Sequence, residues 1–217
     1  MKAQAAIFDL DGVIVDTARY HFLAWKRLAA SLGITLTEAF NEQLKGVGRM
    51  ESLQKILEFG KLSLPPEKME ELAEMKNEWF KEFISRMQPT EIFPEVPGLL
   101  QQLKHNGLCI ALASSSKNAR TVLQRLNLEG VFDAVTDGND IANSKPHPEI
   151  FLTTALRLQL PPSNCVVIED AAAGVEAALR AGMKVVGVGD SSVLQGAHRV
   201  VRQTKEITPA LLKELLL

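Results

Sequence analysis

The sequence predicts an α/β fold, namely a Rossmann-like parallel sheet core with helices on both faces and an inserted all-helical cap domain. Three observations predict it. A short apolar run typical of a buried strand stands at residues 5–8. A long stretch with helical periodicity and no strand follows it. From residue 93 onward, short apolar runs alternate with helical ones, as β-α-β units of a parallel sheet do.

The helical stretch extends over residues 17–87. Its apolar residues recur at three- and four-residue spacing, which indicates amphipathic helices. They include Phe22, Trp25, Leu28, Ala29 and Leu32, then Leu53, Ile56 and Leu57, and later Met69, Leu72, Met75 and Trp79. We therefore predict a four-helix-like cap domain at 17–87 and a core domain formed by 1–16 and 88–217. The linkers, 14–16 and 85–93, are expected to be hinges.

The core domain is expected to contain further strands at 108–113, 134–136, 165–168 and 184–188, with helices through 122–126 and 171–180. Cys109 and Cys165 each lie in one of these apolar runs. We expect both to be small buried core residues, and we see no disulfide framework or zinc site.

Composition excludes several classes of partner. The 217 residues carry 24 Lys and Arg against 26 Asp and Glu, a net charge of −2, so nucleic acid and anionic membrane are not expected partners. No signal peptide or apolar run of membrane-spanning length is visible, which favours a cytoplasmic protein. Acidic residues on the outside of the cap favour a monomer. A small soluble ligand is the expected partner.

Two carboxylates follow the first strand. Asp9 and Asp11 are two residues apart and therefore lie on the same side of an extended backbone, before a turn at Gly12. An Asp-x-Asp sequence by itself also occurs in ordinary turns and metal loops. The other strand ends decide between these interpretations.

Three later segments carry polar groups at the same edge of the predicted sheet. Ser114 opens a hydroxyl-rich turn, Lys145 precedes Pro146, and Glu169 with Asp170 ends a strand. Each also has a simpler interpretation when it is taken alone: Ser114 also fits a helix N-cap, Lys145 a surface lysine, and Asp170 a residue that caps a helix. Ligands of open α/β sheets bind beyond the carboxyl ends of the strands, where all these segments fall. Together they predict a Mg²⁺-dependent phosphoryl-transfer site, in which one aspartate attacks phosphorus and the other handles a proton.

These segments resemble the four motifs of the haloacid dehalogenase superfamily of phosphotransferases, and the resemblance covers nearly the whole chain. Within that superfamily, residues 16–22, 44–49, 76–77 and 113–118 resemble the β-phosphoglucomutase family. The resemblance implies that Asp9 is the nucleophile and Asp11 the general acid/base. It also implies that Ser114 and Lys145 bind the transferring phosphoryl group. The implied Mg²⁺ ligands are Asp9, the Asp11 backbone carbonyl, Glu169 and Asp170.

The resemblance also implies a set of substrate-binding residues. Arg49, Ser116, Lys117 and Asn118 would hold the second phosphate of a bisphosphate, and the sugar side would be formed by Thr17, His21, Trp25, Lys45, Gly46, Val47, Ser52, Lys76 and Ser115. Four of these residues also have a simpler interpretation when each is taken alone. His21 and Trp25 also have the spacing of core residues, Lys76 also fits a solvated charge on a helix, and Arg49 also fits the first residue of a helix. The chain departs from the family pattern at Gly48, often Ser, and at Ser115, often Ala. Gly48 would loosen the backbone beside Arg49.

The implied reaction interconverts β-D-glucose 1-phosphate and β-D-glucose 6-phosphate through an aspartyl-phosphate and β-glucose 1,6-bisphosphate. A phosphatase of small sugar phosphates is the first alternative, in which water attacks the aspartyl-phosphate. A non-catalytic phosphosugar-binding regulator is the remote one. A dinucleotide site is disfavoured, because Gly187-Val188-Gly189 lacks a third glycine and a following helix. A cis bond between Lys145 and Pro146 is a further hypothesis, since it would aim the lysine into the crevice.

Overall fold

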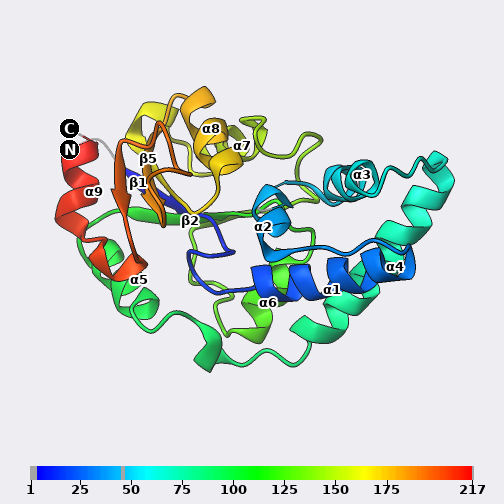
Figure 1. Cartoon of the computed structure of the whole chain (residues 1–217). Coiled ribbons are helices and arrows are strands. Elements are labelled where there is room, and N and C mark those ends of the chain that lie inside the picture. Colours follow the sequence, from blue (N-terminus) through cyan, green and yellow to red (C-terminus); the bar gives the residue numbers. More distant parts are fainter. Residues whose placement is uncertain (1–3, 45–46, 217) are drawn as a thin grey trace.

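The computed structural model describes residues 4–44 and 47–216, and its centre is one parallel sheet (Figure 1). The strand order is β3-β2-β1-β4-β5-β6, and every neighbouring pair is parallel. The strands are β1 (Ala5–Phe8), β2 (Cys109–Ala113), β3 (Ala134–Thr136), β4 (Cys165–Glu169), β5 (Lys184–Val188) and β6 (Arg199–Val201). The predicted α/β fold is confirmed. β6, a three-residue edge strand, is an addition to the prediction.

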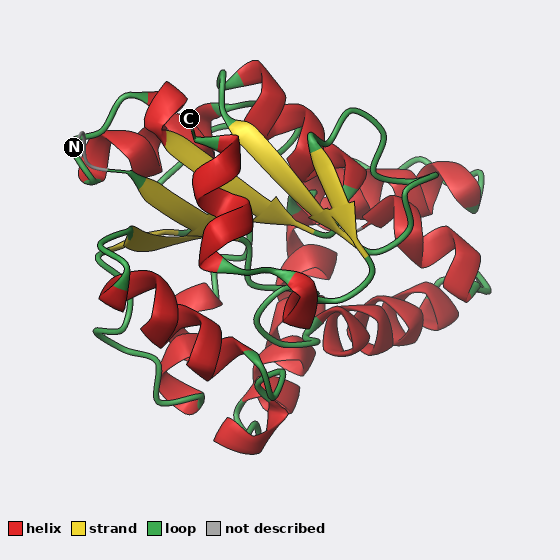
Figure 2. Ribbon diagram, turned by 90° about the vertical axis from the view of Figure 1, so that its left-hand side faces the viewer, coloured by secondary structure: helices red, strands yellow, loops and turns green. Residues whose placement is uncertain are grey.

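Helices cover both faces of the sheet (Figure 2). In β1, Ala5 and Ile7 face one apolar cluster while Ala6 and Phe8 face another, because side chains alternate along a strand. The first cluster is completed by α7 (Glu149–Arg157) and α8 (Ala172–Arg180), and the second by α5 (Val96–His105), α6 (Ala119–Arg125) and α9 (Pro209–Leu215). Single-turn 3-10 helices occupy Glu42–Leu44, Pro89–Glu91, Pro162–Asn164 and Thr204–Glu206.

Of the α-helices between β1 and β2 in the chain, we call the first four the inserted helices, whereas α5 covers the sheet. They are α1 (Ala18–Ser31), α2 (Glu38–Asn41), α3 (Arg49–Phe59) and α4 (Pro66–Ile84). They enclose an apolar cluster of their own, in which Leu28 and Ile56 are fully buried. Phe80 and Ile84, near the end of α4, belong instead to a cluster of the sheet. The inserted helices therefore pack as a unit that is anchored on the core at one end.

The two segments that join the inserted helices to the core run side by side. Val15 and Ile92 form an antiparallel bridge, and the Phe93 N–H donates to the Ile14 carbonyl at 3.0 Å. The chain thus enters and leaves the inserted helices at one place, which is compatible with a shared hinge. That the segments act as hinges stays a prediction.

The two cysteines differ in burial. Cys165 is buried in β4, as predicted, and both thiols are free. Cys109 is only partly buried, so the prediction was wrong for this residue. It is the first residue of β2, and the four residues that follow it in the strand are buried. Within the described residues, no helix is long and apolar enough to cross a membrane.

Candidate active site

Four of the predicted site residues lie at the carboxyl edge of the sheet. Asp9 directly follows β1, Ser114 follows β2, and Glu169 ends β4 with Asp170 after it. The backbone continues the strand pairing here, since the Asp9 N–H donates to the Ile168 carbonyl at 2.9 Å. Because these strands are parallel, their ends meet at one edge and bring together residues that are far apart in the chain.

Lys145 is completely buried at the centre of this edge. Its ammonium group donates to Asp9 Oδ1 at 2.6 Å, to Glu169 Oε1 at 2.7 Å and to the Ala113 carbonyl at 3.2 Å. Burial lowers the pKa of Lys145, but the attraction of Asp9 and Glu169 outweighs burial and raises this pKa above its ordinary value. The lysine is therefore a fixed positive charge against Asp9. The alternative of a surface lysine was wrong, and the Lys145–Pro146 bond is cis, as hypothesised.

Asp9 and Asp11 have different proton affinities although they share one crevice. Burial raises the pKa of Asp9 to about 6, with Lys145 opposing the rise. Burial and the neighbouring charge of Asp9 raise the pKa of Asp11 to about 8. Near neutral pH, Asp9 is thus mainly a carboxylate and Asp11 mainly a carboxylic acid. This is the division of roles that a nucleophile and a general acid require.

Two glycines allow the acidic side chains to approach the backbone closely. A Cβ atom at Gly174 would lie 1.7 Å from Glu169 Oε1, and one at Gly12 would lie 2.0 Å from Asp170 Oδ2. Gly12 also has a φ of +76°, which side-chain-bearing residues rarely adopt. Glu169 Oε2 accepts the Ala171 N–H at 2.7 Å. Asp170 therefore lies directly against the turn that contains Asp11, and does not cap α8, whose N-cap is Ala171.

The oxygens in this crevice fit a hard cation such as Mg²⁺. Asp11 Oδ1 is buried and finds no hydrogen-bond partner among the described residues. The carboxylates of Asp9 and Asp170 and the main-chain oxygen of Asp11 are of the donor type that Mg²⁺ takes together with water and phosphate. No group of three or more His, Cys, Asp or Glu side chains is assembled for a metal in residues 4–44 and 47–216. Both Glu169 oxygens accept protein hydrogen bonds, so Glu169 fits an indirect role through water better than direct coordination.

The inserted helices contribute a second group of buried polar residues. Lys76 is only 2% exposed, and its Nζ lies 2.8 Å from His21 Nδ1 and 4.5 Å from the centre of the Trp25 ring. Burial lowers its pKa to about 7, with a further contribution from Arg49. Burial also lowers the pKa of His21 well below its usual value. The alternative of a solvated Lys76 was therefore wrong. For Trp25 both interpretations hold, because it belongs to the apolar cluster of the inserted helices and also lines the cavity.

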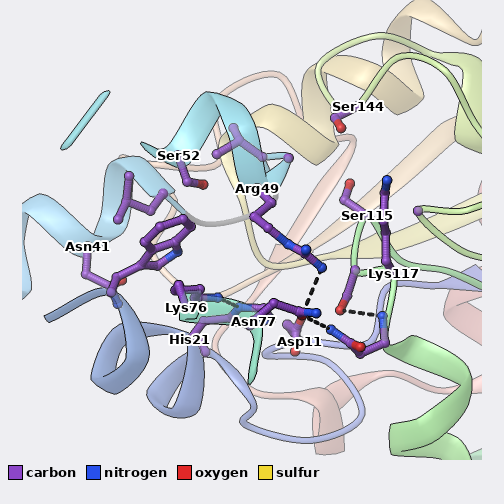
Figure 3. A pocket seen from close by; sticks show the side chains of 18 of the residues that line it. Asp11, His21, Asn41, Arg49, Ser52, Lys76, Asn77, Ser115, Lys117 and Ser144 are labelled. Carbon is purple, nitrogen blue, oxygen red and sulfur yellow. Dashed lines mark hydrogen bonds between the residues drawn. The ribbon is translucent and has the colours of Figure 1, made fainter. Parts of the chain in front are cut away.

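Arg49 and Asn118 meet at a third residue, Asn77. The Asn77 side-chain oxygen accepts from Arg49 Nη2 at 2.8 Å and from Asn118 Nδ2 at 2.9 Å (Figure 3). Arg49 Nη1 also donates to Glu74 Oε2 at 3.1 Å. Arg49 does start α3, as the simpler interpretation holds, and its side chain still points into the cavity.

One cavity joins these groups, between the inserted helices and the strand ends. Predicted residues that line it are Asp9, Asp11, His21, Trp25, Val47, Arg49, Ser52, Lys76, Ser115, Ser116, Lys117, Asn118 and Asp170. Four predicted residues are buried behind its wall, namely Thr17, Ser114, Lys145 and Glu169. Lys45 and Gly46 lie outside the described residues. The sequence analysis gave no site role to seven further residues that line the cavity, namely Ala18, Asn41, Leu44, Gly48, Asn77, Gly138 and Ser144, although four of them lie in the motifs it quoted.

The loop around Ser114 supplies main-chain and hydroxyl groups. Ser114 is buried, its N–H donates to the Thr136 carbonyl at 3.1 Å, and its Oγ accepts from the Ser116 N–H at 3.2 Å. It does not cap α6, whose N-cap is Asn118. Gly48 and Ser144 also line the cavity, and the Gly48 backbone comes close to the Ser144 side chain. A Cβ atom placed on Gly48 would lie 2.4 Å from Ser144 Oγ. The departure at Gly48 thus makes room for the loop that carries Lys145.

Comparison with known proteins agrees with this geometry. The family model of haloacid dehalogenase-like hydrolases matches residues 6–188. The chain belongs to this family. It is 46% identical over 213 residues to the β-phosphoglucomutase of Bacillus subtilis (strain 168), covering 97% of this chain and 94% of that protein. A phosphorylated carbohydrates phosphatase of Thermotoga maritima is 34% identical, covering 98% of this chain and all of that protein.

A solved structure shows the same fold over nearly the whole length. The β-phosphoglucomutase of Clostridium difficile superimposes with a TM-score of 0.94 at 44% identity, and the match covers 99% of this chain and 97% of that one. Both the core and the inserted helices are therefore common to the two chains.

Proposed function

We propose that the protein is a β-phosphoglucomutase, which interconverts β-D-glucose 1-phosphate and β-D-glucose 6-phosphate through β-glucose 1,6-bisphosphate. The observation that carries the proposal is a single cavity that is lined both by Asp9 and Asp11 and by Arg49, Lys117 and Asn118. The reacting phosphoryl group would thus face Asp9 and Asp11, and the second phosphate would face Arg49, Lys117 and Asn118. The 46% identity to a protein of that activity supports the same conclusion.

In this mechanism the Asp9 carboxylate attacks phosphorus, and the bond between phosphorus and the sugar oxygen breaks. Asp11, which holds a proton near neutral pH, gives that proton to the leaving sugar oxygen. In the reverse half, Asp11 takes the proton of the attacking sugar hydroxyl while the phosphoryl group leaves Asp9. Lys145 keeps a positive charge beside Asp9 throughout, and Ser114 organises the loop that faces the phosphoryl group.

The second phosphate would be held by Arg49, Ser116, Lys117 and Asn118. His21, Trp25, Ser52 and Lys76 would contact the sugar or position Asp11, together with Val47 and Ser115. We propose the same role for Lys45 and Gly46, and for Thr17, the N-cap residue of α1. Each end of the bisphosphate would then face its own set of donors. The intermediate can therefore bind in either orientation, with one or the other phosphate beside Asp9.

The proposal includes a Mg²⁺ ion held by Asp9, the Asp11 main-chain oxygen and Asp170, with Glu169 beside them. The ion would neutralise charge on the transferring phosphoryl group. Residues 17–87 would form the cap domain and 1–16 with 88–217 the core domain. We further propose a monomer that acts in the cytoplasm on small sugar phosphates.

A sugar phosphatase is the second candidate, and the 34% identity to a phosphorylated carbohydrates phosphatase favours it. It would use the same aspartates, but water would attack the aspartyl-phosphate. The two functions differ in their products. Purified protein with Mg²⁺, β-glucose 1-phosphate and a trace of the bisphosphate should form glucose 6-phosphate much faster than free phosphate. Free phosphate as the main product would instead establish the phosphatase.

Replacing Asp9 tests either enzyme against a binding regulator. Asp9→Asn removes the anionic nucleophile, so we expect turnover to fall by at least about 10⁴-fold. The variant should still bind glucose 6-phosphate in a calorimetric titration. Retention of full activity would exclude an aspartyl-phosphate mechanism.

A further inference from the structure

Asn77 is a buried polar residue on the inner face of α4 that the proposed mechanism leaves without a role. It is 5% exposed and lies between Ala73 and Phe80, which are also buried on this face. Its amide lines the cavity, where Figure 3 shows it between Arg49 and the core. A polar amide at such a position loses stability unless its hydrogen bonds are made.

The Asn77 amide joins the inserted helices to the core. Its oxygen accepts from Arg49, at the start of α3, and from Asn118, at the start of α6 in the core. An amide oxygen has two acceptor positions, and these two bonds use both. Its nitrogen donates to Glu74 Oε1 at 3.1 Å, which orients the amide with its oxygen toward the two donors.

The donors that converge on Asn77 have the chemistry of an oxyanion site. Arg49 is charged, and burial lowers its pKa from the ordinary value, with Glu74 opposing the shift. Asn118 is 9% exposed and its own N–H is tied to Ser116 Oγ at 3.2 Å. A guanidinium and an amide nitrogen aimed at one oxygen form a pair of donors that a phosphate oxygen can also accept.

We propose that Asn77 is a positioning residue for the second phosphate. Its neutral side-chain oxygen holds Arg49 and Asn118 at one point when no phosphate is bound, and a phosphate oxygen takes over these donors when the sugar phosphate binds. The inference rests on the proposed function, because it assigns Arg49 and Asn118 to a phosphate. Preorganised donors lower the cost of ordering flexible side chains on binding, and an arginine has many rotamers to lose.

The neutrality of Asn77 is part of the inference. A carboxylate in its place would pair with Arg49 more strongly, but it would repel the incoming phosphate. An apolar residue would leave both donors without a shared acceptor. The position thus requires an oxygen acceptor without charge, which is a requirement that a purely structural residue on a helix face does not have.

The test is calorimetric titration of the purified full chain with glucose 6-phosphate, together with kcat and KM for β-glucose 1-phosphate. For Asn77→Ala we expect the dissociation constant to rise about tenfold, because Arg49 and Asn118 are then no longer ordered before the phosphate binds, with KM rising and kcat nearly unchanged. For Asn77→Asp we expect a rise of about a hundredfold that diminishes with added salt.

The matched control is Asn106→Ala. Asn106 follows α5 and precedes β2, so it lies at the opposite, amino edge of the sheet, and binding should be unchanged. Wild-type affinity in Asn77→Ala, or in Asn77→Asp, would overturn the inference. If Asn77→Ala does not fold, the isosteric Asn77→Asp carries the test. If glucose 6-phosphate binds with an affinity that depends on Asn77 but is not converted by the wild type, the proposed function is refuted and this inference stands. If the wild type does not bind glucose 6-phosphate, the inference is refuted.

Discussion

The site contains two buried lysines in opposite electrostatic situations. Lys145, at the strand ends, donates to two carboxylates and a carbonyl, and its pKa is raised. Lys76, on α4, lies against His21 and the rings of Trp25 and Phe80, and burial lowers its pKa to about 7. Both side chains are nearly inaccessible, so burial alone does not decide the charge of a lysine.

The difference shows how the two halves of the site are built. At the strand ends, the Lys145 ammonium group uses its hydrogen bonds on protein groups without a ligand. The inserted helices hold a desolvated cation that has no carboxylate hydrogen-bonded to it in the described structure. An anionic substrate would supply the missing negative charge. We therefore interpret the strand-end network as the permanent part of the site and the wall formed by the inserted helices as the part that substrate completes.

The largest effect is expected from removing Lys145. Lys145→Met leaves Asp9 and Glu169 buried without their counter-charge, and we expect the free energy of unfolding to fall by about 3–5 kcal/mol. Chemical denaturation measures it. Adding Glu169→Gln to this variant should restore part of the stability but not the activity. A loss below about 1 kcal/mol would show that the network is not the permanent part of the site.

The close approach of Glu169 to α8 is expected to have a smaller effect. A methyl group at Gly174 would overlap the Glu169 carboxylate, so Gly174→Ala should lower the free energy of unfolding by about 1–3 kcal/mol and displace the lysine network. Gly98→Ala is the matched control on α5, where nothing lies within 4 Å. It should instead raise stability by up to about 1 kcal/mol. Equal effects of the two substitutions would contradict the structure around Glu169.

The pH dependence of Lys76→Met sharpens the comparison further. The folded pKa of Lys76 is about 7, below its unfolded value, so the unfolded chain binds more protons between these two values. The free energy of unfolding of the wild type should therefore rise in this window relative to that of the variant, by up to about 1.4 kcal/mol per pH unit. Below pH about 7 the variant should be the more stable protein. A difference that is constant with pH would contradict a desolvated Lys76.

The sequence predicted the parallel sheet because its strands are apolar runs with clear breaks between them. β6 was missed because its three residues begin with Arg199 at an edge of the sheet, where burial does not require an apolar run. The helix α9 had a usable signal that was not read, since Thr208 caps it and Pro209 opens it. Segments on the exposed side of the core thus left weaker patterns than the buried strands.

The site was predicted where its residues belong to motifs. Asn77 was named only as part of a motif, yet its position on the buried face of α4, with Ala73 and Phe80, was readable from helical spacing. Ser144 and Gly138 carry no local signal, because loop geometry brings them to the cavity. The opposite pKa shifts of Lys145 and Lys76 depend on neighbours that are distant in the chain, so no local pattern predicts them.

The most direct test is an NMR titration of the lysine Cε and Nζ signals, assigned with Lys76→Met and Lys145→Met, with and without glucose 6-phosphate. We predict that Lys76 titrates near pH 7 in the free protein, and that its pKa rises when the ligand binds, while Lys145 stays protonated across the range. Titration of both lysines at the ordinary value of about 10.4, unchanged by the ligand, would contradict the account.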